Sequence, residues 1–162
     1  MNSLYAISYY LEKALPTGGV VKAYFPKEIL GSILPVVAKE KNCKIISIGG
    51  SKHATAELLK AGVLVNGDFE ADVVLVEPDG MTAEGALLKP EEAKQMKQEA
   101  VAVGSISKWA SKSPASHDTV QVTKTITELG IFSPEQLEQE LSASSSKTSI
   151  PSPTSQGRPA IP

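Results

Sequence analysis

The sequence predicts an α/β protein with a three-layer, mostly parallel, Rossmann-like sheet that carries helices on both faces. The strongest evidence is Val73–Val76, a run of four apolar residues of which three are β-branched. Such a run is typical of a strand that is covered on both faces, as in a parallel sheet. Two further short apolar runs, Val20 to Phe25 and Lys44 to Ile48, precede it and predict two more strands.

Two amphipathic helices are predicted around the first strand. Apolar residues recur at helical spacing from Leu4 to Ala14, and Pro16 to Gly19 ends that helix. The stripe can pack on its own domain or form a partner interface. A second apolar stripe runs from Ile29 to Val37, but Pro35 lies inside it. Because proline removes a helical hydrogen bond, we expect a kink or two short helices there.

A glycine turn follows the strand Lys44 to Ile48 and opens a helix. Gly49, Gly50, Ser51 and Lys52 could hold a phosphate with free backbone amides, the lysine and the helix dipole. The pattern is neither a Walker motif nor a three-glycine dinucleotide motif. The alternative interpretation is a tight turn in which Ser51 caps the helix.

Acidic residues follow the central strand directly. Glu77-Pro78-Asp79-Gly80 ends it, because Pro78 cannot donate to a sheet and Asp-Gly favours a turn. Ligands of open α/β sheets bind at this carboxyl edge. We therefore expect Asp79 to face a cleft with the glycine turn and the loop around Trp109. A magnesium site made by Asp79, Glu77 and Glu84 is an alternative, but solvated acids are the simpler interpretation.

The rest of the chain predicts a smaller set of elements and a tail. A second domain is not expected, so residues 1–141 form one α/β domain and residues 142–162 a disordered Ser/Pro-rich tail. After the central strand we expect a loop with short extended structure from Met81 to Lys89, a helix from Pro90 to about Glu99 and a strand from Ala100 to Ile106. A loop from Lys108 to Asp118 and a strand from Val120 to Ile126 should follow. The last expected helix starts with the capping box Ser133-Pro134-Glu135-Gln136 and ends at Leu141.

The composition excludes several classes of protein. The net charge is −2, with 16 basic residues scattered among 18 acidic ones, so we expect no nucleic-acid partner. Cys43 is the only cysteine, which excludes an intrachain disulfide and, with two histidines, the usual closed zinc site. No long apolar segment predicts a signal peptide or a membrane span. We expect a cytoplasmic protein without a cofactor or a bound metal.

Two stretches resemble one protein family. Ala71 to Lys89, with Ala-Asp-Val-Val-Leu-Val, Asp79-Gly80, Glu84-Gly85 and the final lysine, is similar to a strand and loop of the α, β and δ subunits of eukaryotic translation initiation factor two B. The same loop occurs in their relatives, the methylthioribose-phosphate and ribose-bisphosphate isomerases. Thr125 to Glu135 resembles a later segment of these proteins, in which threonine, an acid and glycine precede a proline-started helix. The wider resemblance is to the CoA-transferase and sugar-phosphate-isomerase superfamily, whose sheet is Rossmann-like.

The resemblance implies a proton-transfer or substrate-hydroxyl role for Asp79 and a phosphate contact for Lys89. The chain differs from the family at Leu88, where the family has asparagine, and at Glu77-Pro78, where it has a small pair. The isomerases' cysteine and the N-terminal helical domain have no counterpart here.

We therefore expect a reduced, non-catalytic member, a binding or regulatory module for a phosphorylated or anionic metabolite that forms a homo- or hetero-oligomer. One alternative is a sugar-phosphate isomerase with Asp79 as acid/base, Lys89 or Lys52 on phosphate, and Glu77 or Glu84 as second carboxylate. The other is a non-enzymatic scaffold or assembly subunit.

Overall fold

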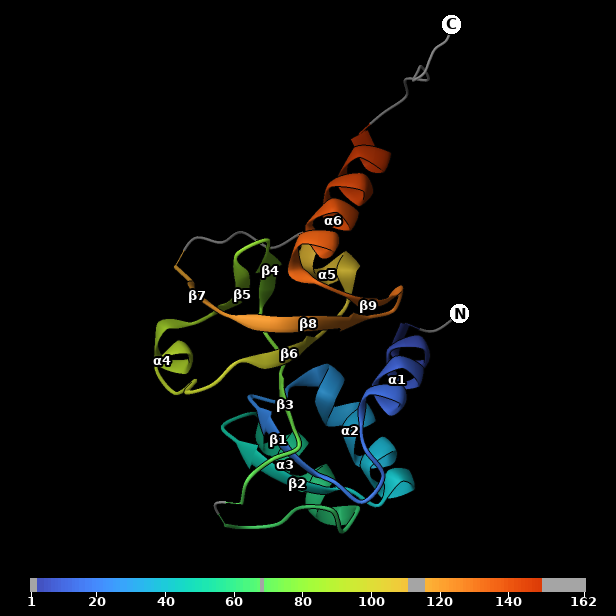
Figure 1. Ribbon diagram of the computed structural model, residues 1–162, viewed down its shortest axis with the longest axis vertical. Coiled ribbons are helices and arrows are strands. Elements are labelled where there is room, and N and C mark those ends of the chain that lie inside the picture. Colours follow the sequence, from blue (N-terminus) through green and yellow to red (C-terminus); the bar gives the residue numbers. More distant parts are fainter. Residues whose placement is uncertain (1–2, 68, 111–115, 150–162) are drawn as a thin grey trace, which may run out of the picture.

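A six-stranded sheet forms the centre of the molecule (Figure 1). The computed structural model describes residues 3–67, 69–110 and 116–149. The strand order is β2-β1-β3-β6-β8-β9, and every neighbouring pair is parallel except β8 and β9. The strands are β1 (Val20–Tyr24), β2 (Lys44–Ile48), β3 (Val73–Val76), β6 (Ala100–Val103), β8 (Val122–Thr127) and β9 (Gly130–Phe132). The predicted mostly parallel α/β sheet is confirmed.

Strand β3 lies inside the sheet between β1 and β6. Leu75 and Val76 are fully buried on its two faces, and Val73 and Val74 are partly buried. The prediction that this apolar run is covered on both sides is therefore confirmed. Leu64, which precedes β3 in the chain, forms one isolated parallel bridge with Ile45 of the edge strand β2.

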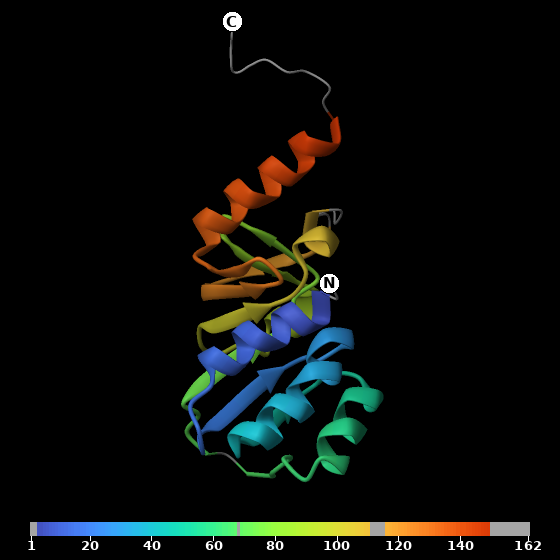
Figure 2. The same cartoon turned by 90° about the vertical axis from the view of Figure 1, so that its right-hand side faces the viewer.

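Three helices cover one face of the sheet. They are α1 (Ser3–Ala14), α2 (Glu28–Lys41) and α3 (Lys52–Lys60), and they lie on the same side in Figure 2. Ile7 and Leu11 of α1 are fully buried in this core, so the α1 stripe packs on its own domain. Helices α2 and α3 approach closely at Gly31, where an added Cβ would lie 2.9 Å from the Cβ of Ala54.

Helix α2 is continuous from Glu28 to Lys41, with Pro35 inside it. Of the two expected alternatives, the break into two short helices is therefore wrong, and the kink at Pro35 stays a prediction. Proline removes one backbone hydrogen bond, whereas burial of Leu30, Leu34 and Val37 on the same helix holds both halves against the sheet.

A second layer covers the other face of β3, β6 and β8. It contains a three-stranded sheet in the order β4-β5-β7 and three helices, and it shares a separate apolar core with the main sheet. Its elements are β4 (Gly80–Thr82), β5 (Gly85–Leu88), β7 (Asp118–Val120), α4 (Pro90–Ala93), α5 (Ile106–Ala110) and α6 (Pro134–Ser149).

Several boundaries in this layer differ from the predictions. The loop with short extended structure expected from Met81 to Lys89 is more regular than predicted, because its extended parts pair as the antiparallel hairpin β4–β5. The helix expected to reach Glu99 ends at Ala93, because the polar residues after it have no apolar stripe to bury. The strand expected to reach Ile106 ends at Val103, and Ile106 to Ala110, expected partly as loop, form helix α5.

The capping box predicted for the last helix is confirmed. The Ser133 amide donates to Gln136 Oε1 at 3.0 Å, and the Gln136 amide donates to Ser133 Oγ at 3.2 Å. Helix α6 continues to Ser149, beyond the expected end at Leu141. Residues 150–162 of the predicted tail lie outside the described residues. No helix among the described residues is both long and apolar enough to cross a bilayer.

Candidate functional site

A cleft of about 190 Å³ lies at the carboxyl edge of the main sheet. Strand β2 lies on one side of β1 in the sheet, and the next strand, β3, lies on the other side of β1. The direction in which strands are added therefore reverses at β1. Such a reversal opens a crevice at the carboxyl ends of the strands. The residues that line the cleft follow β1, β3 and β6: Lys27, Glu28, Ile29, Glu77, Pro78, Asp79, Gly104, Ser105, Lys108 and Trp109.

Glu77 is buried, and its side chain caps the N-terminus of helix α2, although Glu77 itself follows strand β3. Its carboxylate accepts the backbone N–H groups of Lys27 at 2.8 Å, Ile29 at 3.0 Å and Leu30 at 2.8 Å. Burial raises the pKa of Glu77, and these three hydrogen bonds act in the opposite direction. Glu77 therefore fixes the start of α2 against the end of β3 and has little capacity left for a ligand.

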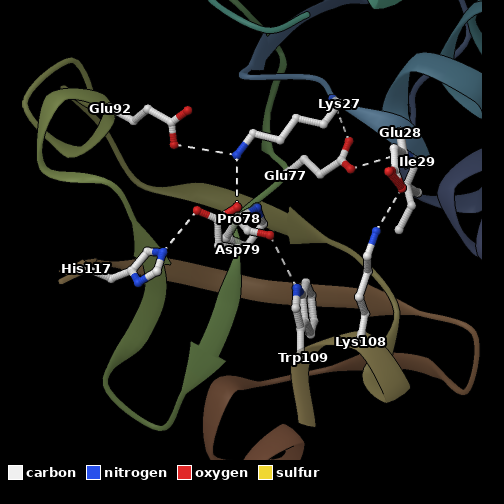
Figure 3. Close-up of polar contacts among 10 residues, drawn as sticks. All are labelled: Lys27, Glu28, Ile29, Glu77, Pro78, Asp79, Glu92, Lys108, Trp109 and His117. Atoms are coloured by element: carbon white, nitrogen blue, oxygen red, sulfur yellow. Dashed lines mark hydrogen bonds and ion pairs between the residues drawn. The ribbon is translucent and has the colours of Figure 1, made fainter. Parts of the chain in front are cut away.

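Asp79 lines the cleft and pairs with the side chains of Lys27 and His117 (Figure 3). Its Oδ1 accepts from Lys27 Nζ at 3.2 Å, and its Oδ2 lies 3.1 Å from His117 Nε2. Partial burial acts to raise the pKa of Asp79, but Lys27 and His117 outweigh it and lower the pKa below its ordinary value. Asp79 is therefore ionised at neutral pH.

Lys27 connects two carboxylates from different parts of the chain. Besides Asp79, its Nζ lies 3.5 Å from Glu92 Oε1, a buried oxygen that has no hydrogen-bond partner among the described residues. At this separation the contact is an ion pair without hydrogen-bond geometry. Lys27 thus joins the end of β1 to the loop after β3 and to α4.

Trp109 forms one wall of the cleft from helix α5. Its Nε1 donates to the carbonyl of Pro78 at 3.4 Å, and its side chain is buried. Its ring lies against Gly104, where an added Cβ would come within 2.2 Å of the indole. On the outer rim, Lys108 Nζ donates to Glu28 Oε2 at 2.9 Å and lowers the pKa of Glu28.

The predicted glycine turn lies at the same edge of the sheet but does not line the cleft. Gly49 and Gly50 have φ values of +67° and +87° and pack closely against Phe25 and Pro26. Ser51 accepts the Ala54 amide at 3.0 Å, as expected for a helix cap. Lys52 is exposed. A phosphate-binding role for this turn stays a prediction.

Two other predicted residues also lie outside the cleft. Lys89 is exposed at the N-cap position of α4, and Glu84 is exposed in the β4–β5 hairpin. The magnesium hypothesis required Glu84 and Glu77 beside Asp79. Within the described ranges no three His, Cys, Asp or Glu side chains meet in a group that could hold a metal.

Sequence reasoning missed Lys27 and His117 as partners of Asp79, and Glu92 as a second partner of Lys27. Lys27 follows Pro26 and has the appearance of an ordinary residue before a helix. It lies 52 positions from Asp79 in the chain, and no local pattern joins the two. The sequence offers one usable signal. Lys27 and Asp79 each follow a predicted parallel strand, so both are expected at the same carboxyl edge of the sheet.

Comparison with solved structures identifies the fold. By sequence, the chain matches no protein-family profile and no curated protein. By structure, it is similar to eIF2B beta from Chaetomium thermophilum, with 17% identity and a TM-score of 0.63 over 88% of this chain and 55% of that one. It is also similar to Pyrococcus horikoshii OT3 translation initiation factor eIF-2B, with 17% identity and a TM-score of 0.60 over 83% of this chain and 65% of that one.

A third similar structure is the delta subunit of eIF-2B from A. fulgidus, with 15% identity and a TM-score of 0.61 over 85% of this chain and 62% of that one. The chain therefore spans 55–65% of the length of these proteins. The resemblance to the initiation factor two B family is confirmed as a shared fold.

Proposed function

We propose that this chain is a regulatory module that binds a small metabolite in the cleft at the carboxyl ends of β1, β3 and β6. The observation that carries the proposal is the Lys27–Asp79–His117 network: Lys27 and Asp79 line a cleft where the strand order reverses, and His117 contacts Asp79. Ligand sites of open α/β sheets lie at this position. The shared fold with eIF2B subunits supports a regulatory role.

The size and chemistry of the cleft favour a sugar phosphate or a similar small anion. A volume of about 190 Å³ is below the ~300–1,000 Å³ of sites that hold drug-sized ligands. Asp79 can accept hydrogen bonds from ligand hydroxyls. Lys27 and Lys108 can turn from their carboxylates toward an anionic group, since both ion pairs are at least partly exposed.

The protonation state of Asp79 favours binding over catalysis. Its lowered pKa leaves the carboxylate ionised, so at neutral pH it has no proton to donate and is only a weak proton acceptor. Its two oxygens are already engaged by Lys27 and His117. A carboxylate held in this way is suited to orienting ligand hydroxyls.

A thermal-shift experiment tests this proposal. Sugar phosphates and nucleoside monophosphates are added to the full chain, and a ligand that binds only the native state raises Tm. Asp79→Asn should remove the shift, whereas Glu84→Gln, a matched change at an exposed acid outside the cleft, should keep it. No shift with any phosphorylated metabolite, or an equal shift in Asp79→Asn, would contradict the proposal.

A second candidate function is a sugar-phosphate isomerase, which the contact between Asp79 and His117 favours. A carboxylate paired with an imidazole can move a proton between neighbouring carbons of a bound sugar. Interconversion of aldose and ketose phosphates, followed by NMR, tests it. Turnover that disappears in Asp79→Asn while ligand binding remains would select the enzyme, and no turnover with a ligand that binds would exclude it.

We also propose that this chain associates with a further protein chain. A structure similar to this chain is the tetrameric eIF2B-beta2-delta2 complex from C. thermophilum. Here Tyr5 and Tyr9 of α1 are exposed, and so are Leu129 and Ile131 of the β8–β9 hairpin that α1 contacts. We name these four residues the α1–β9 patch. Exposed large apolar side chains on two elements that contact each other favour a protein interface there.

A further inference from the structure

A second hollow lies on the face of the main sheet opposite to α1, α2 and α3. It has a volume of about 430 Å³ and is lined by Lys22, Tyr24, Ile48, Lys94, Gln95, Lys97 and Gln98. Lys22 and Tyr24 share this face because alternate residues of β1, Val21 and Ala23, point into the core under the helices. We name this hollow the lysine groove.

The second layer leaves the lysine groove open. Val76 of β3 and Ala102 of β6 are fully buried beneath that layer, whereas Ile48 at the end of β2 is only partly buried. The chain segment from Lys94 to Gln98, which follows α4, forms one side of the groove. The ends of β1 and β2 form its floor with Tyr24 and Ile48.

The charge in the lysine groove is unbalanced. Lys22, Lys94 and Lys97 make no ion pair with any described residue, and no acidic side chain lines the groove. By contrast, Lys27 and Lys108 of the cleft each pair with a carboxylate. In a chain whose net charge is −2, three unpaired lysines around one hollow form a local positive site.

We propose that the lysine groove binds a diphosphate group, either free pyrophosphate or the diphosphate of a nucleotide. Lysine ammonium groups act as point charges for phosphate, and three around one hollow suit a compact ligand with several charges. The Gln95 and Gln98 amides can donate to further phosphate oxygens. An acidic peptide is a less suitable ligand. Its carboxylates on one side of an extended chain repeat only every ~7 Å, whereas the lysines surround a single hollow.

The size of the lysine groove agrees with this ligand class. Its volume of about 430 Å³ lies within the ~300–1,000 Å³ that is typical of small-molecule sites and exceeds that of the cleft. The apolar floor of Tyr24 and Ile48 can accept the non-charged part of a nucleotide. The site is separate from the cleft and does not depend on the proposed function of Asp79.

Isothermal titration calorimetry of the full chain with inorganic pyrophosphate tests the proposal, at low ionic strength because salt screens exposed charges. We expect saturable binding at one site. Lys94→Gln/Lys97→Gln should raise Kd by at least about tenfold, since two charge-assisted contacts are lost. Lys39→Gln/Lys41→Gln removes the same charge from α2 and should change Kd less than about twofold.

A parallel titration with ADP distinguishes the source of the diphosphate. Tighter binding of ADP than of pyrophosphate assigns the groove to a nucleotide, and equal or weaker binding assigns it to free diphosphate. Because both altered lysines are exposed, circular dichroism should show an unchanged fold.

Four results would overturn the proposal. The first two are no binding of either compound up to about 10 mM at low salt, and an equal rise in Kd in the two double lysine variants. The others are loss of pyrophosphate binding in Lys27→Gln alone, and tighter binding of a hexaglutamate peptide than of pyrophosphate.

Discussion

The carboxylate of Glu77, at the end of β3, accepts the backbone N–H of Leu30 in the first turn of α2 at 2.8 Å. This contact joins the end of the central strand to a helical residue that lies 47 positions earlier in the chain. It places Lys27 beside Asp79, because the same carboxylate also accepts the Lys27 amide. The geometry of the cleft therefore depends on a buried acid that is itself a structural cap.

Glu77→Ala should strongly destabilise the fold. The substitution leaves the amides of Lys27, Ile29 and Leu30 without their acceptor in a buried place, at a cost of about 2–4 kcal/mol in the free energy of unfolding. Urea unfolding measures the difference. Glu84→Ala, at an exposed acid, should change stability by less than about 0.5 kcal/mol. Similar values for the two variants would refute the capping role.

The dependence of stability on pH should report the pairing of Asp79. Its pKa in the folded state is lowered from the ordinary value of 3.8, so the native state binds this proton less tightly than the unfolded state does. The resulting stabilisation is complete above the unfolded pKa and is lost as pH falls through the folded pKa.

Asp79→Asn should therefore flatten the fall in unfolding free energy below about pH 4, measured by urea unfolding at a series of pH values. Asp118→Asn, at an exposed acid for which no ion pair is formed with a described residue, serves as the control. A pH profile of Asp79→Asn that is parallel to that of the unaltered chain would count against the pairing.

Gly104→Ala should disturb the wall of the cleft. A methyl group at this position would lie 2.2 Å from the indole of Trp109, and overpacking of this kind costs about 1–3 kcal/mol. Because Trp109 is the only tryptophan, its fluorescence emission reports its displacement directly. The double variant Gly104→Ala/Trp109→Phe should lose less stability than the two single changes added together. Additive losses would show that the two residues do not interact.

The α1–β9 patch should mediate association of the chain. Tyr9→Ser/Leu129→Ser removes two exposed apolar side chains, and we expect a smaller oligomer by light scattering with little change in Tm. Val36→Ser, at an exposed apolar residue of α2, is the control and should leave the mass unchanged. A chain that is monomeric at all concentrations would rule out self-association through the patch.

The sequence by itself determined the kind of sheet and several of its local elements. The apolar run Val73–Val76 indicated a buried parallel strand, the acids after it indicated the edge where Asp79 lies, and Ser133 with Gln136 indicated the start of α6. Each of these signals depends on residues within a few positions of one another. Backbone preference and side-chain pattern act over that range.

Only the tertiary structure decided which side chains meet around Lys27 and Asp79. Lys27, Asp79, Glu92 and His117 come from four separate segments, and the order of the strands determines that they converge. The same order left Lys89 and the glycine turn outside the cleft. Strand order results from long-range packing of two apolar cores on opposite faces of one sheet, and no short stretch of sequence encodes it.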